Sequence, residues 1–216
     1  MNQNSDIKKT VCVIVAHPDD ETLWAGGTIL MHPEWDCKVF TLCRASDPDR
    51  APKFYQALLR LGAKGDMADL DDGTEQTPLP ENEMQKTILD HTDNNHFDLI
   101  LTHGPRGEYT RHRRHEEVSK TVLKLWYSGY LNTDQIWFFA YSDGNKTNLP
   151  LPEPGAHYKI PLPSPIWKDK QHIITQIYGF SPDSWEAQTT PKEEAFWTFN
   201  SQAKAREWFI EKDTRP

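Results

Sequence analysis

The sequence has few cysteines, no long apolar run and no excess of basic residues, and each absence excludes a class of protein. Three cysteines among 216 residues are an odd number, and a chain of this length can bury a core without disulfides, so we expect no disulfide framework. The longest apolar run, residues 11–16, is far shorter than the roughly 18 residues of a membrane span. The first ten residues are polar, which argues against a signal peptide. We therefore expect a cytoplasmic protein without a transmembrane segment.

The charge balance is acidic. The chain has 24 Lys and Arg against 32 Asp and Glu, which gives a net charge of −8. Nucleic acids and anionic membrane surfaces attract clustered basic residues, so neither is expected as the main partner. Hydrophobic residues at 37% and charged residues at 26% are ordinary for a globular protein, and no repeat or low-complexity tract is present.

Segments typical of strands and helices alternate along the first two-thirds of the chain. Residues 11–16 form a continuous, β-branched run, which indicates a strand covered on both faces. The expected strands are 11–16, 37–43, 67–70, 97–102 and 135–140, and the expected helices are 20–31, 50–61, 81–92 and 114–128. This order predicts an α/β fold, a Rossmann-like three-layer sandwich with a mainly parallel sheet.

The amino-acid composition of the sequence changes after Asp143. Six prolines lie within residues 148–165, so this segment is not expected to be helical and is a poor candidate for a central strand. Two helical pieces are expected near 166–178 and 200–211. We expect one domain spanning residues 1–216, in which residues 144–216 form a Pro-rich appendage packed on the core.

The most informative segment reads HPDDE and follows the first strand directly. Ligand sites of open parallel sheets lie beyond the carboxyl ends of the strands. His17 and Asp20 are three residues apart, so one helical turn can aim an imidazole and a carboxylate at one point. Asp19 would then point elsewhere and be free to act as a base, while Glu21 needs no more than a hydrogen-bonding role. The alternative is a helix-capping Asp pair beside an incidental histidine.

A second cluster follows the strand at 97–102. His112 and His115 are three residues apart at the start of the next helix. A His/Asp/His set with an open fourth position is what a catalytic zinc ion needs. The alternative is a solvated basic face, since Arg111, Arg113 and Arg114 interleave with the histidines.

Residues 13–29 read VIVAHPDDETLWAGGTI and closely resemble the opening motif of the LmbE-like (PIG-L) zinc-dependent N-deacetylases. These enzymes remove acetyl groups from N-acetylglucosamine-type sugars. The resemblance implies an LmbE-like fold and a metal-dependent hydrolase that removes an N-acetyl group from a small-molecule amino sugar or glycoconjugate. It further implies Zn²⁺ as the cofactor, although such ligands also accept other divalent ions. His17 and Asp20 would be zinc ligands, and Asp19 the catalytic base.

The segment GEYTRHRRH, residues 107–115, resembles the second motif of this family. By that resemblance His115 is the third zinc ligand, and a protonated His112 or the Tyr109 hydroxyl assists at the oxyanion. Arg50, at the start of a helix ending in Leu-Gly, resembles the substrate-binding arginine of the family, although a surface role is an equal alternative. The chain departs from the family pattern between the two histidines, where it has two arginines, and three residues after Arg50, where Lys53 replaces an acidic residue.

Other functions stay open from the sequence. The same metal centre could cleave a larger acyl amide, or the chain could be a non-catalytic relative that binds metal or sugar. A nucleotide-binding protein is disfavoured because the turn after the first strand carries carboxylates in place of a Gly-rich phosphate loop. The sequence leaves open the specific substrate and whether the chain forms a homo-oligomer.

Overall fold

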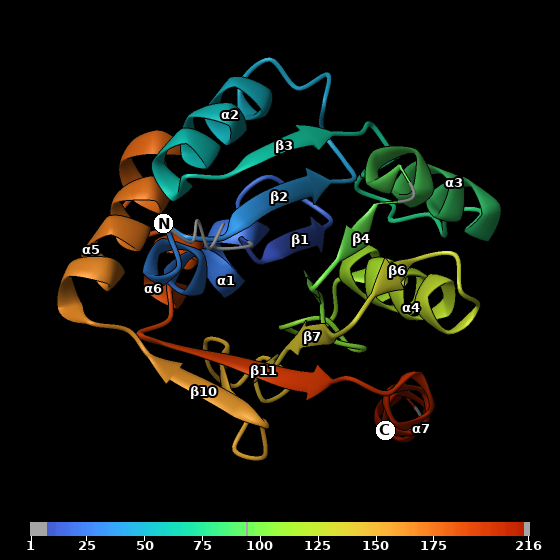
Figure 1. Ribbon diagram of the computed structural model, residues 1–216. Coiled ribbons are helices and arrows are strands. Elements are labelled where there is room, and N and C mark those ends of the chain that lie inside the picture. Colours follow the sequence, from blue (N-terminus) through green and yellow to red (C-terminus); the bar gives the residue numbers. More distant parts are fainter. Residues whose placement is uncertain (1–7, 94, 214–216) are drawn as a thin grey trace, which may run out of the picture.

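The computed structural model describes residues 8–93 and 95–213, and within them a sheet of seven strands forms the centre (Figure 1). The strands lie in the order β10-β11-β7-β5-β1-β2-β3. Their bounds are Thr10–Val15 for β1, Asp36–Thr41 for β2, Lys64–Met67 for β3, Leu99–Thr102 for β5, Ile136–Phe139 for β7, Tyr158–Pro161 for β10 and Glu193–Phe199 for β11. β3, β2, β1, β5 and β7 run parallel, whereas β11 and β10 are antiparallel to their neighbours. The expected mainly parallel sheet is confirmed.

The order of the strands places a ligand-binding position at the centre of the sheet. From β1 the chain moves outward through β2 to β3, and it then returns to the opposite side of β1 as β5. In open α/β sheets, ligands bind where the strand order reverses, beyond the carboxyl ends of the strands. His17 follows β1 and His103 follows β5, so the two motifs of the sequence meet at this point.

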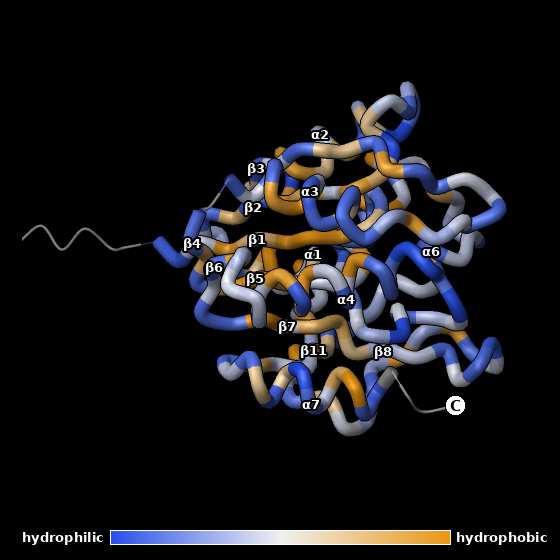
Figure 2. The backbone as a smooth tube through the Cα atoms, turned by 90° about the vertical axis from the view of Figure 1, so that its right-hand side faces the viewer, coloured by the Kyte–Doolittle hydropathy of each residue, from blue (hydrophilic) through white to orange (hydrophobic). Residues whose placement is uncertain are grey.

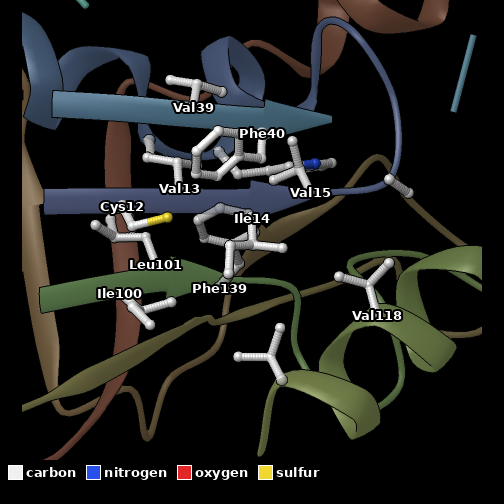
Figure 3. Close-up of a cluster of buried hydrophobic side chains, with 14 of the residues drawn as sticks. Cys12, Val13, Ile14, Val15, Val39, Phe40, Ile100, Leu101, Val118 and Phe139 are labelled. Atoms are coloured by element: carbon white, nitrogen blue, oxygen red, sulfur yellow. The ribbon is translucent and has the colours of Figure 1, made fainter. Parts of the chain in front are cut away.

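The core is densest around β1, because both faces of this strand are covered. Val13 pairs with Val39 of β2 on one side and with Leu101 of β5 on the other. Residues 11–15 are all fully buried. Figure 3 shows the side chains of these strands lying together with Phe40 and Phe139. Two-sided burial is the physical reason for the unbroken apolar run at this position.

Helices cover both faces of the sheet and complete three layers, as expected. Their bounds are Asp20–Met31 for α1, Arg50–Leu61 for α2, Glu81–Thr92 for α3, Arg113–Tyr127 for α4, Ser164–His172 for α5, Ile173–Ile177 for the π-helix η1, Trp185–Thr189 for α6 and Gln202–Asp213 for α7. α1 packs with α2, α5 and η1 on one face, and α4 packs with α3 and α7 on the other (Figure 1). Hydrophobic residues gather along β1 and its neighbours between these layers (Figure 2).

The helix periodicity read from the sequence holds for α2 and α4. Phe54, Ala57, Leu58 and Leu61 are the buried residues of α2. This helix ends at Gly62, which adopts a φ of 70° that a glycine tolerates at no steric cost. The apolar stripe expected on α4 is likewise buried and faces the sheet.

The expected strand at 67–70 is wrong in its position, because the third strand is Lys64–Met67. β3 lies at the edge of the sheet and its residues Lys64 and Asp66 are exposed, so it lacks an apolar pattern. Met67 and Leu70, which suggested the strand, are buried at its end and in the loop that follows.

The C-terminal part contributes strands that the sequence analysis did not identify. β11 lies inside the sheet, paired with β7 and β10, and its residues 194–197 are buried. Within the Pro-rich segment, β9 (Leu151–Pro152) pairs with β8 (Tyr141–Ser142), and β10 occupies the sheet edge, where Pro161 costs no central ladder bond. α5 begins at Ser164, inside the segment expected to be non-helical, because Pro165 lies in the first turn, where a missing N–H is tolerated.

Two short strands, β4 (His96–Phe97) and β6 (Asn132–Thr133), form a separate parallel pair. Among the described residues, no helix combines the length and the apolar character needed to cross a membrane.

Candidate metal centre and active site

The loop between β1 and α1 folds around the side chain of Asp20, which begins α1. The main-chain N–H of His17 donates to Asp20 Oδ2 at 2.9 Å, and the ring atom Nδ1 of His17 lies 3.1 Å from the same oxygen. Trp24, one turn further along α1, donates from Nε1 to Asp20 Oδ1 at 3.2 Å. Trp24 is fully buried, so it supports the carboxylate of Asp20 from the protein interior and does not line the pocket.

Three side chains predicted as metal ligands converge on one point. His17 Nδ1 lies 3.1 Å from Asp20 Oδ2 and 3.2 Å from His115 Nε2. His115 Nε2 lies 3.3 Å from Asp20 Oδ2. The three atoms therefore form a nearly equilateral triangle, although His115 is separated from the other two by about half of the chain.

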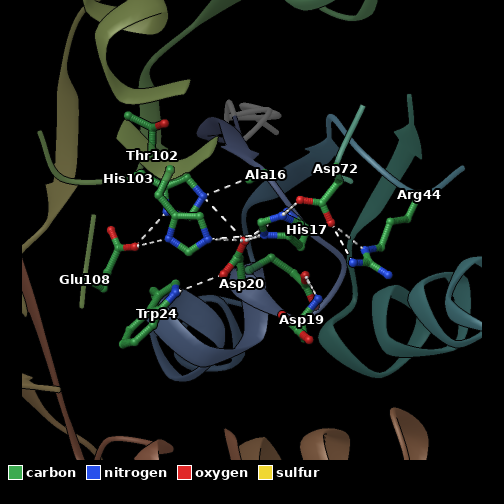
Figure 4. Close-up of polar contacts among 12 residues, drawn as sticks. Ala16, His17, Asp19, Asp20, Trp24, Arg44, Asp72, Thr102, His103 and Glu108 are labelled. Atoms are coloured by element: carbon green, nitrogen blue, oxygen red, sulfur yellow. Dashed lines mark hydrogen bonds and ion pairs between the residues drawn. The ribbon is translucent and has the colours of Figure 1, made fainter. Parts of the chain in front are cut away.

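A carboxylate fixes the outer nitrogen of each histidine. His17 Nε2 lies 3.1 Å from Asp72 Oδ1, and His115 Nδ1 lies 2.7 Å from Glu108 Oε2. When these outer nitrogens donate to the carboxylates, the inner nitrogens carry free lone pairs directed into the triangle. Figure 4 shows Asp20 beside His17, between the two flanking carboxylates Asp72 and Glu108.

Asp72 is itself held by the protein. It accepts from Arg44 Nε and Nη2 at 3.0 and 2.6 Å, and from Gln76 Nε2 at 3.0 Å. Partial burial acts in the opposite direction, but the contacts with His17, Gln76 and Arg44 hold the pKa of Asp72 well below its usual range. Asp72 is therefore a charged carboxylate that orients the ring of His17.

His103 belongs to the support of the centre. Its Nε2 accepts from the main-chain N–H of Ala16 at 3.0 Å, and its Nδ1 lies 2.9 Å from Glu108 Oε2. Both nitrogens are thereby engaged, even though Nε2 also lies 3.5 Å from Asp20 Oδ2. Glu108 in turn receives the N–H of Gly104 at 2.9 Å, so this fully buried carboxylate joins both histidines to the loop after β5.

The residues present fit a divalent ion with an open coordination position. Four-coordinate zinc binds nitrogen at about 2.0 Å, which places its donors about 3.3 Å apart. The separations within the triangle, 3.1 to 3.3 Å, agree with that requirement. His112 lies next to this triangle, since His17, His112 and His115 have ring nitrogens within 4.8 Å of one another. His112 Nδ1 is buried without a hydrogen-bond partner among the described residues, which indicates that it contacts a ligand.

The charges around the triangle favour a cation. Although burial acts against it, His115 and His103 lower the pKa of Asp20 well below its usual range, so Asp20 stays ionised. Burial acts to lower the pKa of His115, but the contacts with Asp20 act in the opposite direction, and this pKa lies above its usual value. Glu108 is also ionised: burial raises its pKa, but the two histidines bring it down to about 2. A field that attracts protons to the histidines attracts a metal ion for the same reason.

Asp19 lies beside the triangle and takes no part in it. Its carboxylate Oδ2 accepts from Arg50 Nη1 at 3.2 Å, and both residues line the same pocket as His17 and Asp20. Burial and the neighbouring charge of Asp20 raise the pKa of Asp19 well above its usual value, against the opposing effect of Arg50. A carboxyl group of raised pKa can both accept and return a proton near neutral pH.

Tyr109 and His112 line the same pocket as Asp19. The Tyr109 ring lies 5.8 Å from that of His112 and 4.7 Å from that of Trp185, in edge-to-face contacts. Burial raises the pKa of Tyr109 above its usual range, so its hydroxyl is neutral and able to donate. Burial and the neighbouring histidines His115 and His17 lower the pKa of His112 to about 3. This lowered pKa favours the neutral ring, whereas the protonated His112 expected from the sequence stays a prediction.

The pocket at this point is lined mainly by polar side chains. Its residues are His17, Pro18, Asp19, Asp20, Leu23, Arg44, Arg50, Asp72, Tyr109, His112, Trp185 and Glu186. Every residue predicted for the site lines this pocket, except His115. The side chain of His115 is fully buried and contributes to the triangle from the protein interior. Sequence reasoning missed Asp72, Glu108, Trp185 and Glu186. Glu108 lies inside the quoted GEY motif, whereas nothing in the sequence pattern distinguishes Asp72 from the other acidic loop residues.

Comparisons with known proteins bear on the fold and the family of the chain. The chain is 24% identical over 193 residues to the uncharacterized protein L374 of Acanthamoeba polyphaga mimivirus, which covers 82% of this chain and 79% of that protein. N,N'-diacetylchitobiose deacetylase from Pyrococcus horikoshii superposes with a TM-score of 0.67 at 16% identity, over 89% of this chain and 84% of that one. The 4-carboxy-2-hydroxymuconate hydratase GalB from Pseudomonas putida KT2440 superposes with a TM-score of 0.64 at 15% identity, over 88% and 95% of the two chains. At these identities, the two solved structures establish the fold alone.

A family model adds a match at the level of sequence. The model of the PIG-L family, described as GlcNAc-PI de-N-acetylase, matches residues 12–126, which is more than half of the chain. The matched region begins in β1 and ends in α4, and it therefore includes the triangle, both flanking carboxylates and Asp19. The chain belongs to the PIG-L family.

Proposed function

We propose that this protein is a metal-dependent hydrolase that removes the N-acetyl group from an amino sugar of the N-acetylglucosamine type. The observation that carries the proposal is the triangle of His17 Nδ1, Asp20 Oδ2 and His115 Nε2, with sides of 3.1 to 3.3 Å and a separate carboxylate, Asp19, beside it. Amide hydrolysis needs an activated water, a group that moves its proton and a stabilised oxyanion, and this pocket has candidates for all three.

The cofactor in this proposal is Zn²⁺, held by His17, Asp20 and His115, with other divalent ions as alternatives of the same ligand chemistry. When bound, such an ion lowers the pKa of a water molecule towards neutrality and polarises a carbonyl oxygen. Asp72 and Glu108 keep the two imidazoles in the tautomer that leaves the inner nitrogens free.

The remaining chemistry belongs to side chains of the pocket. Asp19 accepts the proton of the attacking water and returns it to the nitrogen of the leaving amine, so that acetate and a free amino sugar are formed. The His112 ring or the Tyr109 hydroxyl donates to the former carbonyl oxygen as negative charge develops on it. Arg50 keeps Asp19 in place and, as a pocket residue, is the candidate for contact with a substrate hydroxyl.

Several features support a sugar as the substrate. The pocket presents charged side chains and the Tyr109 hydroxyl together with the aromatic ring of Trp185, and its described lining is mainly polar. The family model is described by its action on a glycolipid amino sugar, and the neighbour from P. horikoshii is a deacetylase of diacetylchitobiose. An N-acetylated sugar or glycoconjugate of small size fits these features.

The proposal also includes the setting of the enzyme. We place it in the cytoplasm as a single catalytic domain; Cys12, Cys37 and Cys43 are free and buried, and β11 of the C-terminal part shares one sheet with the strands that hold the site. Whether two copies associate is left to measurement.

A second candidate is favoured by one observation. GalB, a 4-carboxy-2-hydroxymuconate hydratase, superposes about as well as the deacetylases, so a hydratase is the second candidate. A hydrolase of a larger acyl amide and a non-catalytic binder of metal or sugar are further alternatives.

One experiment separates these functions. Acetate release is measured with zinc-loaded protein against N-acetylglucosamine, N,N'-diacetylchitobiose, an N-acetylglucosaminyl lipid and an acylated amino-sugar antibiotic, with and without a chelator. We expect acetate from at least one N-acetyl sugar, loss of that release with chelator and its recovery on addition of Zn²⁺. Zinc uptake without release of acetate or any longer acid would indicate a binding protein, and chelator-resistant release would exclude the proposed centre.

A further inference from the structure

Asp19 has an unusual main-chain conformation. Its φ is 113° and its ψ is −29°, in the left-handed region that residues with a side chain rarely adopt. Such conformations cost free energy and persist only where surrounding contacts hold them, and they concentrate at functional sites. The contacts that hold Asp19 therefore also decide where its carboxylate points.

The main chain of Asp19 is held at both of its polar groups: its carbonyl oxygen accepts from the N–H groups of Thr22 and Leu23, and its N–H contacts a side chain. Its N–H donates to Glu21 Oε2 at 2.9 Å. The other oxygen of Glu21 accepts from the Tyr178 hydroxyl at 2.7 Å and from Thr22 Oγ1 at 2.6 Å. Glu21 is fully buried and Tyr178 is 2% exposed, so these bonds are shielded from water. Through Glu21, Tyr178 fixes the peptide group before Asp19.

A second contact holds the carboxylate of Asp19. Arg50 Nη1 donates to Asp19 Oδ2 at 3.2 Å. The guanidinium carbon of Arg50 lies 4.5 Å from the centre of the Phe180 ring, within the range of a cation–π contact. Phe180 therefore packs against the guanidinium group of Arg50 and limits its rotation.

Both contacts lead to one turn of the chain. Tyr178 and Phe180 flank Gly179, which follows η1 and has a φ of 80° that favours glycine. The N–H groups of Tyr178 and Phe180 donate to the carbonyls of Ile173 and Ile174 at 2.9 and 3.2 Å, which anchors the turn on the π-helix. The sharp bend at Gly179 directs one aromatic side chain to Glu21 and the other to Arg50.

We propose that the turn of residues 178–180 is a positioning device for the catalytic base. Tyr178 acts through Glu21 on the main chain of Asp19, and Phe180 acts through Arg50 on its carboxylate. The inference rests on the proposed function, in which Asp19 moves the proton. It assigns part of that function to the C-terminal third of the chain, since the turn lies beyond residues 12–126, which match the family model.

Two single variants test the device. Tyr178→Phe removes one hydroxyl, and Phe180→Leu removes the aromatic face while it keeps an apolar side chain. We expect each to lower kcat for acetate release from N,N'-diacetylchitobiose by about tenfold, because small misplacements of a catalytic group lower rates strongly. KM and zinc content should stay within about twofold of the wild-type values. The conservative variant Phe180→Tyr keeps the aromatic ring, so its kcat should equal that of the wild type.

A double-mutant cycle excludes a merely structural role. In an Asp19→Ala background, Tyr178→Phe should cause no further loss of kcat, because the group it positions is gone. The matched control is Tyr141→Phe, which removes another buried hydroxyl, one that contacts the main chain of Ala195 at 3.2 Å. This control should lower the melting temperature as Tyr178→Phe does, with kcat unchanged.

A readout independent of activity completes the test. In a crystal structure of the double variant Tyr178→Phe/Phe180→Leu, Asp19 should leave the left-handed region and Arg50 should move from its carboxylate. Retention of φ near the present 113° would overturn the inference. Unchanged kcat in both single variants would also overturn it while leaving the proposed function intact, provided that Asp19→Ala is inactive. Full activity of Asp19→Ala would overturn both.

Discussion

Replacement of Asp19 by alanine should lower kcat for acetate release by about 100-fold or more, the usual contribution of a general base. The reason is geometric: Asp19 lies in the pocket beside the triangle and its carboxylate contacts Arg50, so its loss removes the proton acceptor and leaves all three ligands in place. Zinc content, measured by elemental analysis of the same preparations, should stay at the wild-type value.

Asp49→Ala is the matched control for this variant. Asp49 is an exposed carboxylate near the start of α2, paired with Lys53 at 2.7 Å, and its loss should leave kcat within about twofold. Normal turnover by Asp19→Ala would show that another group moves the proton. A large loss of zinc in that variant would instead show that Asp19 belongs to the ligand set.

Replacement of His115 by alanine should abolish stable metal binding and, with it, activity. His115 supplies one corner of the triangle and connects it to Glu108, so its loss removes a donor and leaves a buried carboxylate with one partner fewer. The affinity for Zn²⁺ should fall by more than the roughly 10- to 100-fold that is typical when an outer partner of a ligand is lost. A competition titration with a zinc-binding dye measures this change.

His96→Ala provides the comparison, since His96 is an exposed histidine that contacts Asp134 at 3.1 Å, at the other end of the sheet. It should bind Zn²⁺ as tightly as the wild type. If His115→Ala also retained wild-type affinity, His115 would be excluded as a ligand, and a centre formed by His17 with other residues would have to be considered.

The side chains that the sequence predicted as metal ligands lie together in the structure, and each of the two motifs that carry them is local in the sequence. His17, Asp19 and Asp20 lie within four consecutive positions after a strand whose apolar run is unmistakable, and His115 lies one helical turn from His112. The partners of these residues are harder to predict. Asp72 reaches His17 from an irregular loop after β3, and its contact depends on how that loop folds back over the sheet.

The fold was predicted where burial leaves a periodic pattern and missed where it does not. β3 is an exposed edge strand, so its polar residues carry no strand signal. β11 has a run of aromatic and β-branched residues that favours a strand, but it begins with two glutamates. Glu194 is tolerated inside because Lys170 donates to it at 2.6 Å and the main chain of Gly27 and Thr28 donates at 2.7 Å. Those partners are distant in sequence, so no local sequence pattern predicts that Glu194 is buried.

The positioning turn shows the same limitation. Neither Tyr178 nor Phe180 belongs to a motif, and each acts on Asp19 only through a second residue. The sequence assigns Glu21 no more than a hydrogen-bonding role, and the structure supplies its partners, which include the N–H of Asp19 and the hydroxyl of Tyr178.

The most direct test of the central claim is anomalous X-ray diffraction at the zinc edge from crystals grown with Zn²⁺. We expect one strong anomalous peak from a zinc ion that is bonded to His17 Nδ1, Asp20 and His115 Nε2 at about 2.0 to 2.2 Å, with Asp19 outside bonding distance. A peak coordinated by His103, or no peak between the histidines at saturating zinc, would contradict the account.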